Sequence, residues 1–399
     1  MRYAHLADCH IGSWREPLLK DLAIEAFEIA VDSIIKERLD FVLIAGDLFN
    51  TSFPPIEHLR RTVQKVKQLK DNGISVYIIP GSHDYSPSGK TMLDILEAAG
   101  LLTNVSRGEI VNERLKLKFT QDKKTGAKLT GILGKMGSLE KSYFEEMERA
   151  HLESEPGYKI FLFHALLTEL KPGKLSDVQS YALSLLPKNF NYYAGGHPHF
   201  VFSEKIQGYG RVAYPGPLFP NSFSELEELG NGGFFIIEND SVRRMEVKLH
   251  DVHSISIDCA HMSAEKAREK VIAEVRGKSF ANSIVTLRLF GTLDSGKPSD
   301  IQLNDIIEAI RANGAHAVLK NISGLASMEF TEIKISKSEP KQVEEGLINE
   351  YVSGNELKGI SSRELARKLI DVLDTERQEG ETVYNFERRI KEEVDRVLK

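Results

Sequence analysis

The sequence predicts an α/β protein whose first domain is a layered sandwich of sheets and helices. Stretches of helical spacing alternate with apolar runs too short for helices, at 17–38, 40–45, 56–72 and 75–80. A βαβαβ order of this kind implies a mostly parallel sheet that is buried on both faces. Short polar motifs follow the expected strands, and open α/β sheets bind ligands at that edge.

The remaining elements of the first 250 residues continue this alternation. A strand is expected over 2–7, before the first motif, and a helix over 90–100. Short antiparallel strands are expected within 104–134, then a helix over 138–152 and a strand over 158–163. Later strands are expected over 190–195, 200–206, 211–214, 233–238 and 242–249. We therefore expect residues 1–250 to form one domain.

The alternation starts again after residue 250. Strands and helices are expected over 253–258, 263–276, 283–290, 300–313, 316–320 and 328–336. These elements predict a small α/β domain over 251–337. The segment 338–399 is charged and helix-prone, with helices expected over 342–351, 361–373 and 383–398. Ser362 and Glu364 at the start of the second of these indicate a capped amphipathic helix.

Composition excludes several classes of protein. The chain has 399 residues, 41% hydrophobic and 28% charged, and lacks the run of roughly 20 apolar residues that a membrane span needs. Its two cysteines, Cys9 and Cys259, are far apart and predict a reducing compartment without a disulfide framework. The net charge of −6 does not indicate a nucleic-acid-binding protein, although a local basic face or a bound cation could contact phosphate.

Five short motifs carry the chemistry of the chain. They are DCH at 8–10, GD at 46–47, GSHD at 81–84, His164 and GGHPH at 195–199. Each is weak alone, but together, each after an expected strand, they form a specific signal. Imidazole and carboxylate ligands suit Mn²⁺, Fe²⁺ or Zn²⁺. Two such ions about 3.5–4 Å apart can clamp a phosphoryl group for in-line attack, with Asp47 as the natural bridging carboxylate.

For several residues a purely structural role is the alternative to a functional one. His164 alone could be a core histidine, but its place after the apolar run 158–163 favours a ligand. Basic pairs such as Arg60-Arg61 favour a solvated face over a DNA contact. Trp14 could cover the site, stack on a base or simply pack. Glycines beside the motifs permit sharp turns and close approach to a phosphate.

With these five motifs the chain resembles the calcineurin-like metallophosphoesterases. More narrowly, AGDLFN, IIPGSHD, YYAGGHPH and VAYPG resemble the DNA double-strand-break repair nuclease of the meiotic-recombination complex, bacterial SbcD type. The resemblance covers residues 1 to about 235. It implies a four-layer sandwich of two mixed sheets flanked by helices over 1–250. It further implies a DNA-capping domain over 251–337 and a helical segment over 338–399 that binds an ATPase partner.

The resemblance also assigns roles to residues. It implies two Mn²⁺ ions per chain, with Mg²⁺, Fe²⁺ or Zn²⁺ as alternatives. The first ion would be held by Asp8, His10, Asp47 and His199. The second would be held by Asp47, Ser82, His164 and His197. His83 would stabilise the phosphate or protonate the leaving oxygen, oriented by Asp84.

Two departures from the family pattern concern this site. Ser82 stands where the family has asparagine, so the second ion is expected to be held more loosely. Asn50 stands where some members have a histidine that contacts the substrate phosphate, and it is our candidate for substrate binding. A lesser departure is the PLFP run at 217–220, where relatives often carry a serine and an arginine.

The function implied is a Mn²⁺-dependent nuclease of double-strand-break repair. It would act as a 3′-to-5′ exonuclease on duplex ends and an endonuclease on single strands, with an SMC-like coiled-coil ATPase as partner. A homodimer through the helices at 56–72 and 90–100 and an intracellular location, cytoplasmic or nucleoid and away from membranes, are also expected. Two alternatives stay open: a phosphoesterase for a small phosphodiester, and a DNA-end tethering scaffold whose second metal site is weakened, which only Ser82 supports.

Overall fold

The computed structural model describes residues 1–86, 90–135, 141–328, 356–357, 360–375 and 383–398. The chain divides into two compact units, Met1–Ser327 and Met328–Lys399. The helix expected over 342–351 lies outside the described residues, as does all but Met328 of the strand expected over 328–336. None of the helices in the described ranges combines the length and apolarity that crossing a membrane requires.

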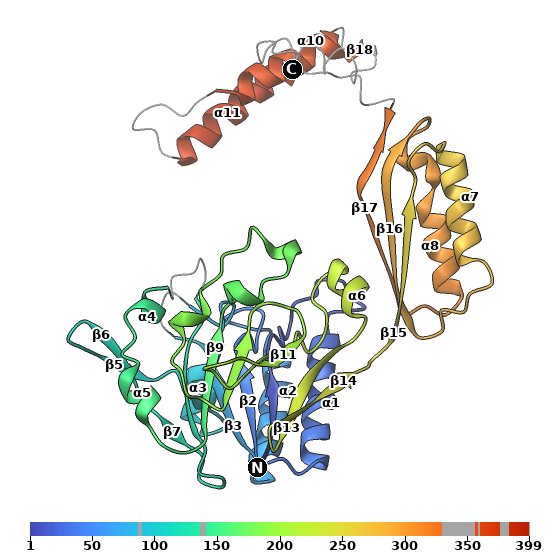
Figure 1. Cartoon of the computed structure of the whole chain (residues 1–399). Helices are drawn as coiled ribbons and strands as arrows, with labels where there is room; N and C mark the ends of the chain where they lie inside the picture. The colour runs from blue at the N-terminus through green and yellow to red at the C-terminus, as the bar shows by residue number, and fades with distance from the viewer. Residues whose placement is uncertain (87–89, 136–140, 329–355, 358–359, 376–382, 399) are drawn as a thin grey trace. The chain divides into compact units, whose positions relative to one another are not determined.

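The first sheet of unit 1 has six strands in the order β14-β13-β1-β2-β3-β4 (Figure 1). Their bounds are β1 Arg2–Leu6, β2 Phe41–Ala45, β3 Ser75–Ile79, β4 Thr103–Asn104, β13 Gly232–Glu238 and β14 Ser241–Val247. Strands β1 to β4 are parallel, and β13 joins β1 in antiparallel register with Ala4 opposite Ile236. The predicted strands of the βαβαβ start are thus confirmed.

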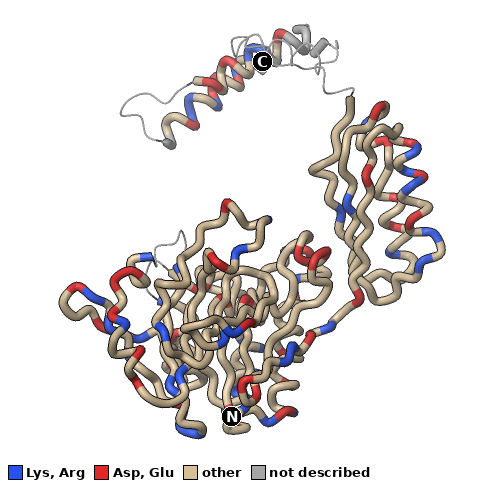
Figure 2. The backbone as a smooth tube through the Cα atoms, viewed as in Figure 1, with Lys and Arg blue, Asp and Glu red and all other residues tan. Residues whose placement is uncertain are grey.

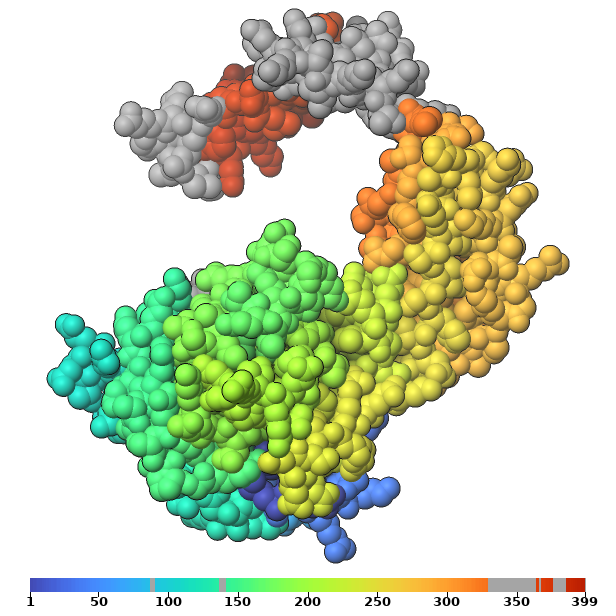
Figure 3. Space-filling model, in the orientation of Figure 1, coloured from blue at the N-terminus to red at the C-terminus, as the bar shows by residue number. Residues whose placement is uncertain are grey.

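The second sheet also has six strands, in the order β11-β12-β10-β9-β8-β7. Their bounds are β7 Thr120–Gln121, β8 Lys128–Ile132, β9 Lys159–His164, β10 Tyr192–Gly196, β11 Phe202–Lys205 and β12 Arg211–Tyr214. Strands β8, β9, β10 and β12 are parallel. A separate hairpin of β5 Gly108–Val111 and β6 Arg114–Leu117 projects from the body of the domain, in cyan in Figure 3.

The two sheets face each other and are flanked by helices. Between them lies a shared core that includes Phe41 and Leu43 of the first sheet and Ile160, Leu162 and Tyr192 of the second. Helices α1 Leu22–Lys36, α2 Ile56–Asp71 and α3 Met92–Ala98 pack on the other face of the first sheet. Short helices α4 Lys141–Glu145 and α5 Ala150–Ser154 join the core beyond the second sheet. The predicted four-layer α/β sandwich is confirmed.

The small α/β part of unit 1 has a core of its own. It consists of β15 Asp251–Asp258, α7 Ala264–Val275, β16 Ser283–Leu293, α8 Leu303–Ala312 and β17 Ala317–Ser327. The three strands are parallel in the order β15-β16-β17, and α7 and α8 cover one face of this sheet (Figure 1). Acidic and basic residues alternate over both helices, as Figure 2 shows, which is typical of solvated faces. We call residues 251–327 the small domain.

Several predicted elements differ from the structure. The helix expected over 138–152 is replaced by α4 and α5, and residues 136–140 lie outside the described ranges. Short antiparallel strands were expected within 104–134, and the pairs β5–β6 and β7–β8 confirm this, but β4 pairs in parallel with β3 and β8 with β9. The strand expected over 316–320 extends to Ser327. Helix α6, Phe223–Leu229, was not predicted because two turns are too short to show a helical period.

The described part of unit 2 is mainly helical. Helices α10 Ser362–Leu373 and α11 Val383–Leu398 are present as predicted, and they contact each other. Before them, β18 Glu356–Leu357 and β19 Ile360–Ser361 form a two-residue antiparallel pair. Leu373 and Leu398, at the ends of the two helices, are 64% and 47% exposed. The hydrophobic faces of these helices are therefore only partly covered.

Candidate metal centre

The candidate ligands lie where strands of both sheets end. Asp8 follows β1, Asp47 follows β2, His164 ends β9 and His197 directly follows β10. The loops after β1 and β2 are tied together, because the Asp8 amide donates to the Gly46 carbonyl (3.2 Å) and the His10 amide to the Asp47 carbonyl (2.9 Å). The His197 amide crosses between the sheets to the Asp8 carboxylate, 2.9 Å away. Segments far apart in the sequence thus converge at one edge.

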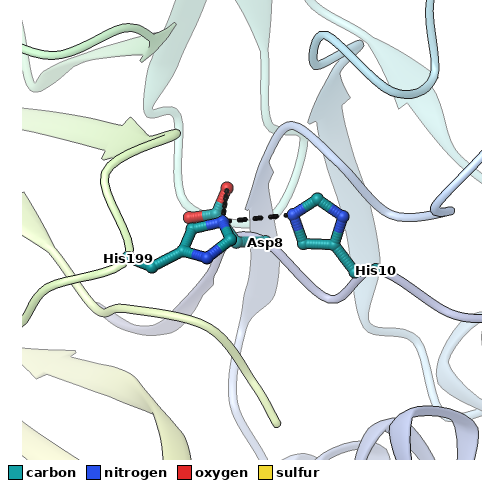
Figure 4. Close-up of side chains that lie close together, drawn as sticks. All are labelled: Asp8, His10 and His199. Carbon is teal, nitrogen blue, oxygen red and sulfur yellow. Dashed lines mark hydrogen bonds and ion pairs between the residues drawn. The ribbon is translucent and has the colours of Figure 1, made fainter. Parts of the chain in front are cut away.

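His10 and His199 point the same ring nitrogen at each other (Figure 4). Their Nε2 atoms are 3.2 Å apart. Each Nδ1 lies beside an oxygen atom, Asn50 Oδ1 at 3.2 Å and Glu225 Oε1 at 2.9 Å, and this favours a proton on Nδ1 and leaves Nε2 to face the site. Two Nε2 lone pairs that face each other need a proton or a cation between them. With metal–nitrogen bonds of about 2.0–2.1 Å, neighbouring ligand atoms lie about 3 Å apart, as these do.

His164 and Asp47 form the second half of the cluster. Nδ1 of His164 donates to the Ala45 carbonyl at 2.8 Å, and its Nε2 lies 3.1 Å from Asp47 Oδ2. This Nε2 is buried and has no hydrogen-bond partner among the described residues. A buried imidazole nitrogen 3.1 Å from a carboxylate oxygen needs a proton or a cation between the two atoms, as expected of a pair of metal ligands.

Three groups of side chains have ligand atoms close enough to share an ion. They are Asp8 with His10 and His199, Asp8 with Asp47 and His164, and His10 with Asp47 and His83, each within 4.8 Å. Asp8, His10, Asp47 and His164 are almost fully buried, at 0–3% exposure. His83 and His197 are exposed and form the rim that a substrate can reach. The residues present therefore fit a cation site with one open side.

The backbone is strained at this cluster. Asp8, His10, Asp47 and His197 all have positive φ angles, of 50°, 41°, 51° and 91°. Non-glycine residues in this region cost about 1–3 kcal/mol each and persist only where the surrounding structure over-determines them. Four of them in one cluster indicate that the fold holds these side chains in place against local preference.

Two glycines make room for ligand side chains. A Cβ on Gly46 would lie 2.2 Å from His164 Nδ1, and the φ of Gly46 is +87°. A Cβ on Gly81 would lie 2.2 Å from Asp47 Oδ1. We expected glycines here to let the backbone approach a phosphate, whereas at these two positions the space is taken by the ligands themselves.

The structure corrects one expected contact. We expected Asp84 to orient His83, but the Asp84 carboxylate accepts hydrogen bonds from the backbone amides of Leu48, Phe49 and Gly81. Burial and the nearby Asp47 charge raise the pKa of Asp84 to about 7. Asp84 therefore ties the loop after β2 to the loop after β3, and reaches His83 only through the backbone.

His83 is instead oriented by the loop that carries Asn50. Its Nδ1 lies 3.0 Å from the Asn50 carbonyl oxygen, and its amide donates to Asp47 Oδ1 at 2.8 Å. The His83 Nε2 atom is left for other partners. The Asn50 side chain, our candidate for a substrate contact, is held against His10 Nδ1. Asn50 thus connects a candidate ligand to the candidate proton donor.

Ser82 and His197 lie beside the Asp47–His164 pair. Ser82 Oγ is 3.3 Å from Asp47 Oδ2, so the hydroxyl reaches the carboxylate that we expect to bridge. The His197 ring lies 5.2 Å from the His164 ring, centroid to centroid. All eight residues named for the metals and for His83 are thus brought together, while the chemical role of each stays a prediction.

Glu225 is the residue that the sequence reasoning missed. It accepts from His199 Nδ1 through Oε1 and from the Asn221 amide through Oε2, both at 2.9 Å. Burial tends to raise the pKa of Glu225, but the hydrogen bond from His199 outweighs this effect, so the pKa of Glu225 is lowered. Its sequence setting, a serine three residues before a glutamate, is the ordinary signature of a helix N-terminus. No signal in the sequence connects Glu225 to His199.

Metal binding is predicted to release protons. Burial lowers the pKa of His164, but the adjacent Asp47 carboxylate more than offsets this and raises it to about 10. Burial likewise opposes the charge on His199, but Glu225 and Asp8 raise its pKa to about 9. Ligands must be deprotonated to bind, so affinity for Mn²⁺ should rise with pH up to about 9–10.

Calorimetry tests this expectation. Mn²⁺ is titrated at pH 7.5 in buffers that differ in ionisation enthalpy. The apparent binding enthalpy should change linearly with the ionisation enthalpy of the buffer, with a slope that corresponds to release of one to two protons. Binding enthalpies that are the same in every buffer would contradict the prediction.

The first half of the chain matches a known protein family. Residues 1–200 match the family model described as calcineurin-like phosphoesterase. The chain belongs to the calcineurin-like phosphoesterases, and it is accordingly a metal-dependent phosphoester hydrolase.

Within this class the chain is homologous to archaeal proteins named DNA double-strand break repair protein Mre11. It is 28% identical to that of Methanopyrus kandleri over 290 residues, 69% of this chain and 62% of the relative. Identity to the Archaeoglobus fulgidus protein is 25% over 355 residues, 84% of this chain and 77% of the relative. Identity to the Methanococcus maripaludis protein is 26% over 392 residues, 93% of this chain and 95% of the relative.

Proposed function

We propose that this chain is a Mn²⁺-dependent DNA nuclease of double-strand-break repair. It would degrade duplex ends from 3′ to 5′ and cut single strands internally. The observation that carries the metal chemistry is the pair of facing Nε2 atoms of His10 and His199, 3.2 Å apart beside Asp8. The DNA substrate is supported by the names of the archaeal relatives, which align with up to 93–94% of this chain.

Each residue of the site would have a distinct role in hydrolysis. Asp8, His10, Asp47 and His199 would hold one cation, and Asp47, Ser82, His164 and His197 the other. Cations held there would neutralise the charge of a phosphoryl group and activate water. His83, exposed at the rim and fixed through Nδ1 by the Asn50 carbonyl, would present Nε2 to the phosphate and protonate the leaving oxygen. Asn50 would keep the His10 proton on Nδ1, so that Nε2 is the ligand atom.

A homodimer and an ATPase partner belong to the same proposal. Large apolar side chains are exposed on the helices expected to form the dimer, Ile56 of α2 at 84% and Ile95 of α3 at 58%. By contrast Arg61 of α2 pairs with Glu28, which favours a folding role for this basic pair over a DNA contact. Helices α10 and α11, with Leu373 and Leu398 exposed, would dock on an SMC-like coiled-coil ATPase.

An assay with two substrates tests the proposed function against its rivals. With Mn²⁺, the full chain should shorten blunt duplex DNA labelled at one 5′ end and nick single-stranded circles, and Asp47→Ala should do neither. Hydrolysis of bis-nitrophenyl phosphate without DNA cleavage would instead support a phosphoesterase for small substrates. Fewer than one bound Mn²⁺ per chain and no hydrolysis would support the tethering scaffold.

The substitution Ser82→Asn is predicted to tighten the second ion. A carboxamide oxygen reaches further than a hydroxyl and is a better donor to a divalent cation, and Ser82 Oγ already lies beside Asp47 Oδ2. We expect roughly tenfold stronger binding of the weaker Mn²⁺, equivalent to about 1.4 kcal/mol. Isothermal titration measures it, and Ser82→Ala should shift affinity the other way. Equal affinities in all three proteins would exclude position 82 from the metal site.

A further inference from the structure

Helix α6 contacts the candidate metal centre through one residue. Glu225 accepts the Nδ1 proton of His199, and its other carboxylate oxygen accepts from the Asn221 amide. Ser222 caps the start of the helix, and its hydroxyl accepts from the Glu225 amide at 3.2 Å. Glu225 is therefore fixed at backbone and side chain, and the His199 ring takes its orientation from α6.

The same helix also binds one arginine of the small domain. Arg288 on β16 donates through Nε to Glu227 Oε1 (3.0 Å) and through Nη2 to Glu227 Oε2 (2.6 Å). Its Nη2 also donates to Ser224 Oγ at 3.3 Å, and its guanidinium lies 5.0 Å from the centre of the Phe223 ring. A bidentate, partly buried arginine–carboxylate pair is the geometrically strict kind of ion pair.

These contacts alternate along five residues of α6, from Phe223 to Glu227. Phe223, Ser224 and Glu227 face Arg288, while Glu225 lies between them in sequence and holds His199. Figure 2 shows α6 with acidic residues and no basic ones, and Arg288 is the cation that pairs with its Glu227. Because one short helix moves as a unit, displacement of Arg288 relative to the first domain would displace Glu225 as well.

We propose that α6 is a positioning element through which the small domain sets the metal affinity of the His199 site. Arg288 holds α6, and α6 holds Glu225 against His199 Nδ1. A carboxylate on the far nitrogen of a ligand histidine fixes its ring and raises its basicity, and loss of such a contact typically weakens metal binding about 10–100-fold. The inference rests on the proposed role of His199 as a ligand.

Binding of Mn²⁺ to the full chain, measured as the loss of the free-ion electron paramagnetic resonance signal, tests the proposal. We expect Glu225→Gln to weaken one of two sites about 10-fold or more. Arg288→Ala and Glu227→Gln should weaken the same site about 2- to 10-fold. The double variant of Arg288→Ala with Glu227→Gln should bind Mn²⁺ no more weakly than either single variant, because both changes break the same ion pair.

Matched controls lie on the same elements. Glu228→Gln alters the next residue of α6, which pairs with Lys174 and not with Arg288, and Arg311→Ala breaks a surface pair with Glu308 inside the small domain. Both should leave Mn²⁺ affinity unchanged. The exchanged pair, Glu227→Arg with Arg288→Glu, should recover at least part of the affinity that either single change loses. Melting temperatures of the metal-free proteins identify any variant whose loss comes from unfolding.

The outcomes separate the inference from the function on which it rests. If Arg288→Ala, Glu227→Gln and the exchanged pair all bind Mn²⁺ as the natural chain does while Glu225→Gln binds weakly, α6 does not transmit the position of the small domain. If His199→Ala itself leaves Mn²⁺ binding unchanged, the proposed ligand set is wrong, and the inference is overturned with it.

Discussion

Replacing Asp47 with alanine is expected to abolish phosphodiester hydrolysis. Its Oδ2 lies 3.1 Å from His164 Nε2 and 3.5 Å from His10 Nε2, so one carboxylate serves both halves of the cluster. Loss of a carboxylate shared by two cations would remove several kcal/mol of charge stabilisation, and each 1.36 kcal/mol is tenfold in rate. We expect kcat/KM to fall by at least about 10³-fold and Mn²⁺ stoichiometry to fall below two per chain.

The backbone conformation of Asp47 determines which matched variant is suitable. Its φ of 51° is strained for alanine as well as for aspartate, and its Oδ1 accepts from the His83 amide. Asp47→Asn keeps the shape and tolerates positive φ better, so it serves as the matched variant. Both should fold and both should lose metal. An Asp47→Asn protein that retains two ions and full activity would remove Asp47 from the bridging position.

Replacing His83 with glutamine is expected to lower kcat by about 10²- to 10⁴-fold without loss of metal, because a general acid contributes that much. His83 is exposed, and its ring is 4.7 Å from that of His10, close enough to reach a phosphate that the cluster holds. Its Nδ1 is committed to the Asn50 carbonyl. Single-turnover hydrolysis and Mn²⁺ titration of the same sample separate the two effects.

The leaving group gives the control for His83. A substrate with a good leaving group, such as bis-nitrophenyl phosphate, needs little protonation, so His83→Gln should cost much less on it than on DNA. An equal loss on both substrates would assign His83 to phosphate binding and not to proton transfer. Depressed Mn²⁺ affinity would instead assign it to the metals, as its place within 4.8 Å of ligand atoms of His10 and Asp47 allows.

The sequence was most informative where side chains follow buried strands. Asp8, Asp47 and His164 each follow or end a short apolar run, and parallel strands bring their carboxyl ends to one edge, so the cluster follows from the order of elements. The parallel pairing of β8 with β9 was missed because pairing direction depends on contacts far apart in the chain. The same holds for the orientation of His83, since we expected Asp84 as its partner and the loop geometry places the Asn50 carbonyl there instead.

Helix α6 marks the limit of such reasoning. It spans two turns, and its Ser222–Glu225 spacing reads as a simple cap. Its contacts with His199 and Arg288 join residues 26 and 61 positions apart, which no local pattern encodes. The functional role of a short helix of this kind is set by what the fold places on either side of it.

We propose that this chain holds two cations about the Asp47 carboxylate. Anomalous scattering from crystals soaked with Mn²⁺ tests it most directly. We expect two peaks per chain, one on each side of the Asp47 carboxylate. The first should lie beside Asp8, His10 and His199, and the second beside His164 and His197. A single peak, or peaks away from Asp47, would contradict it.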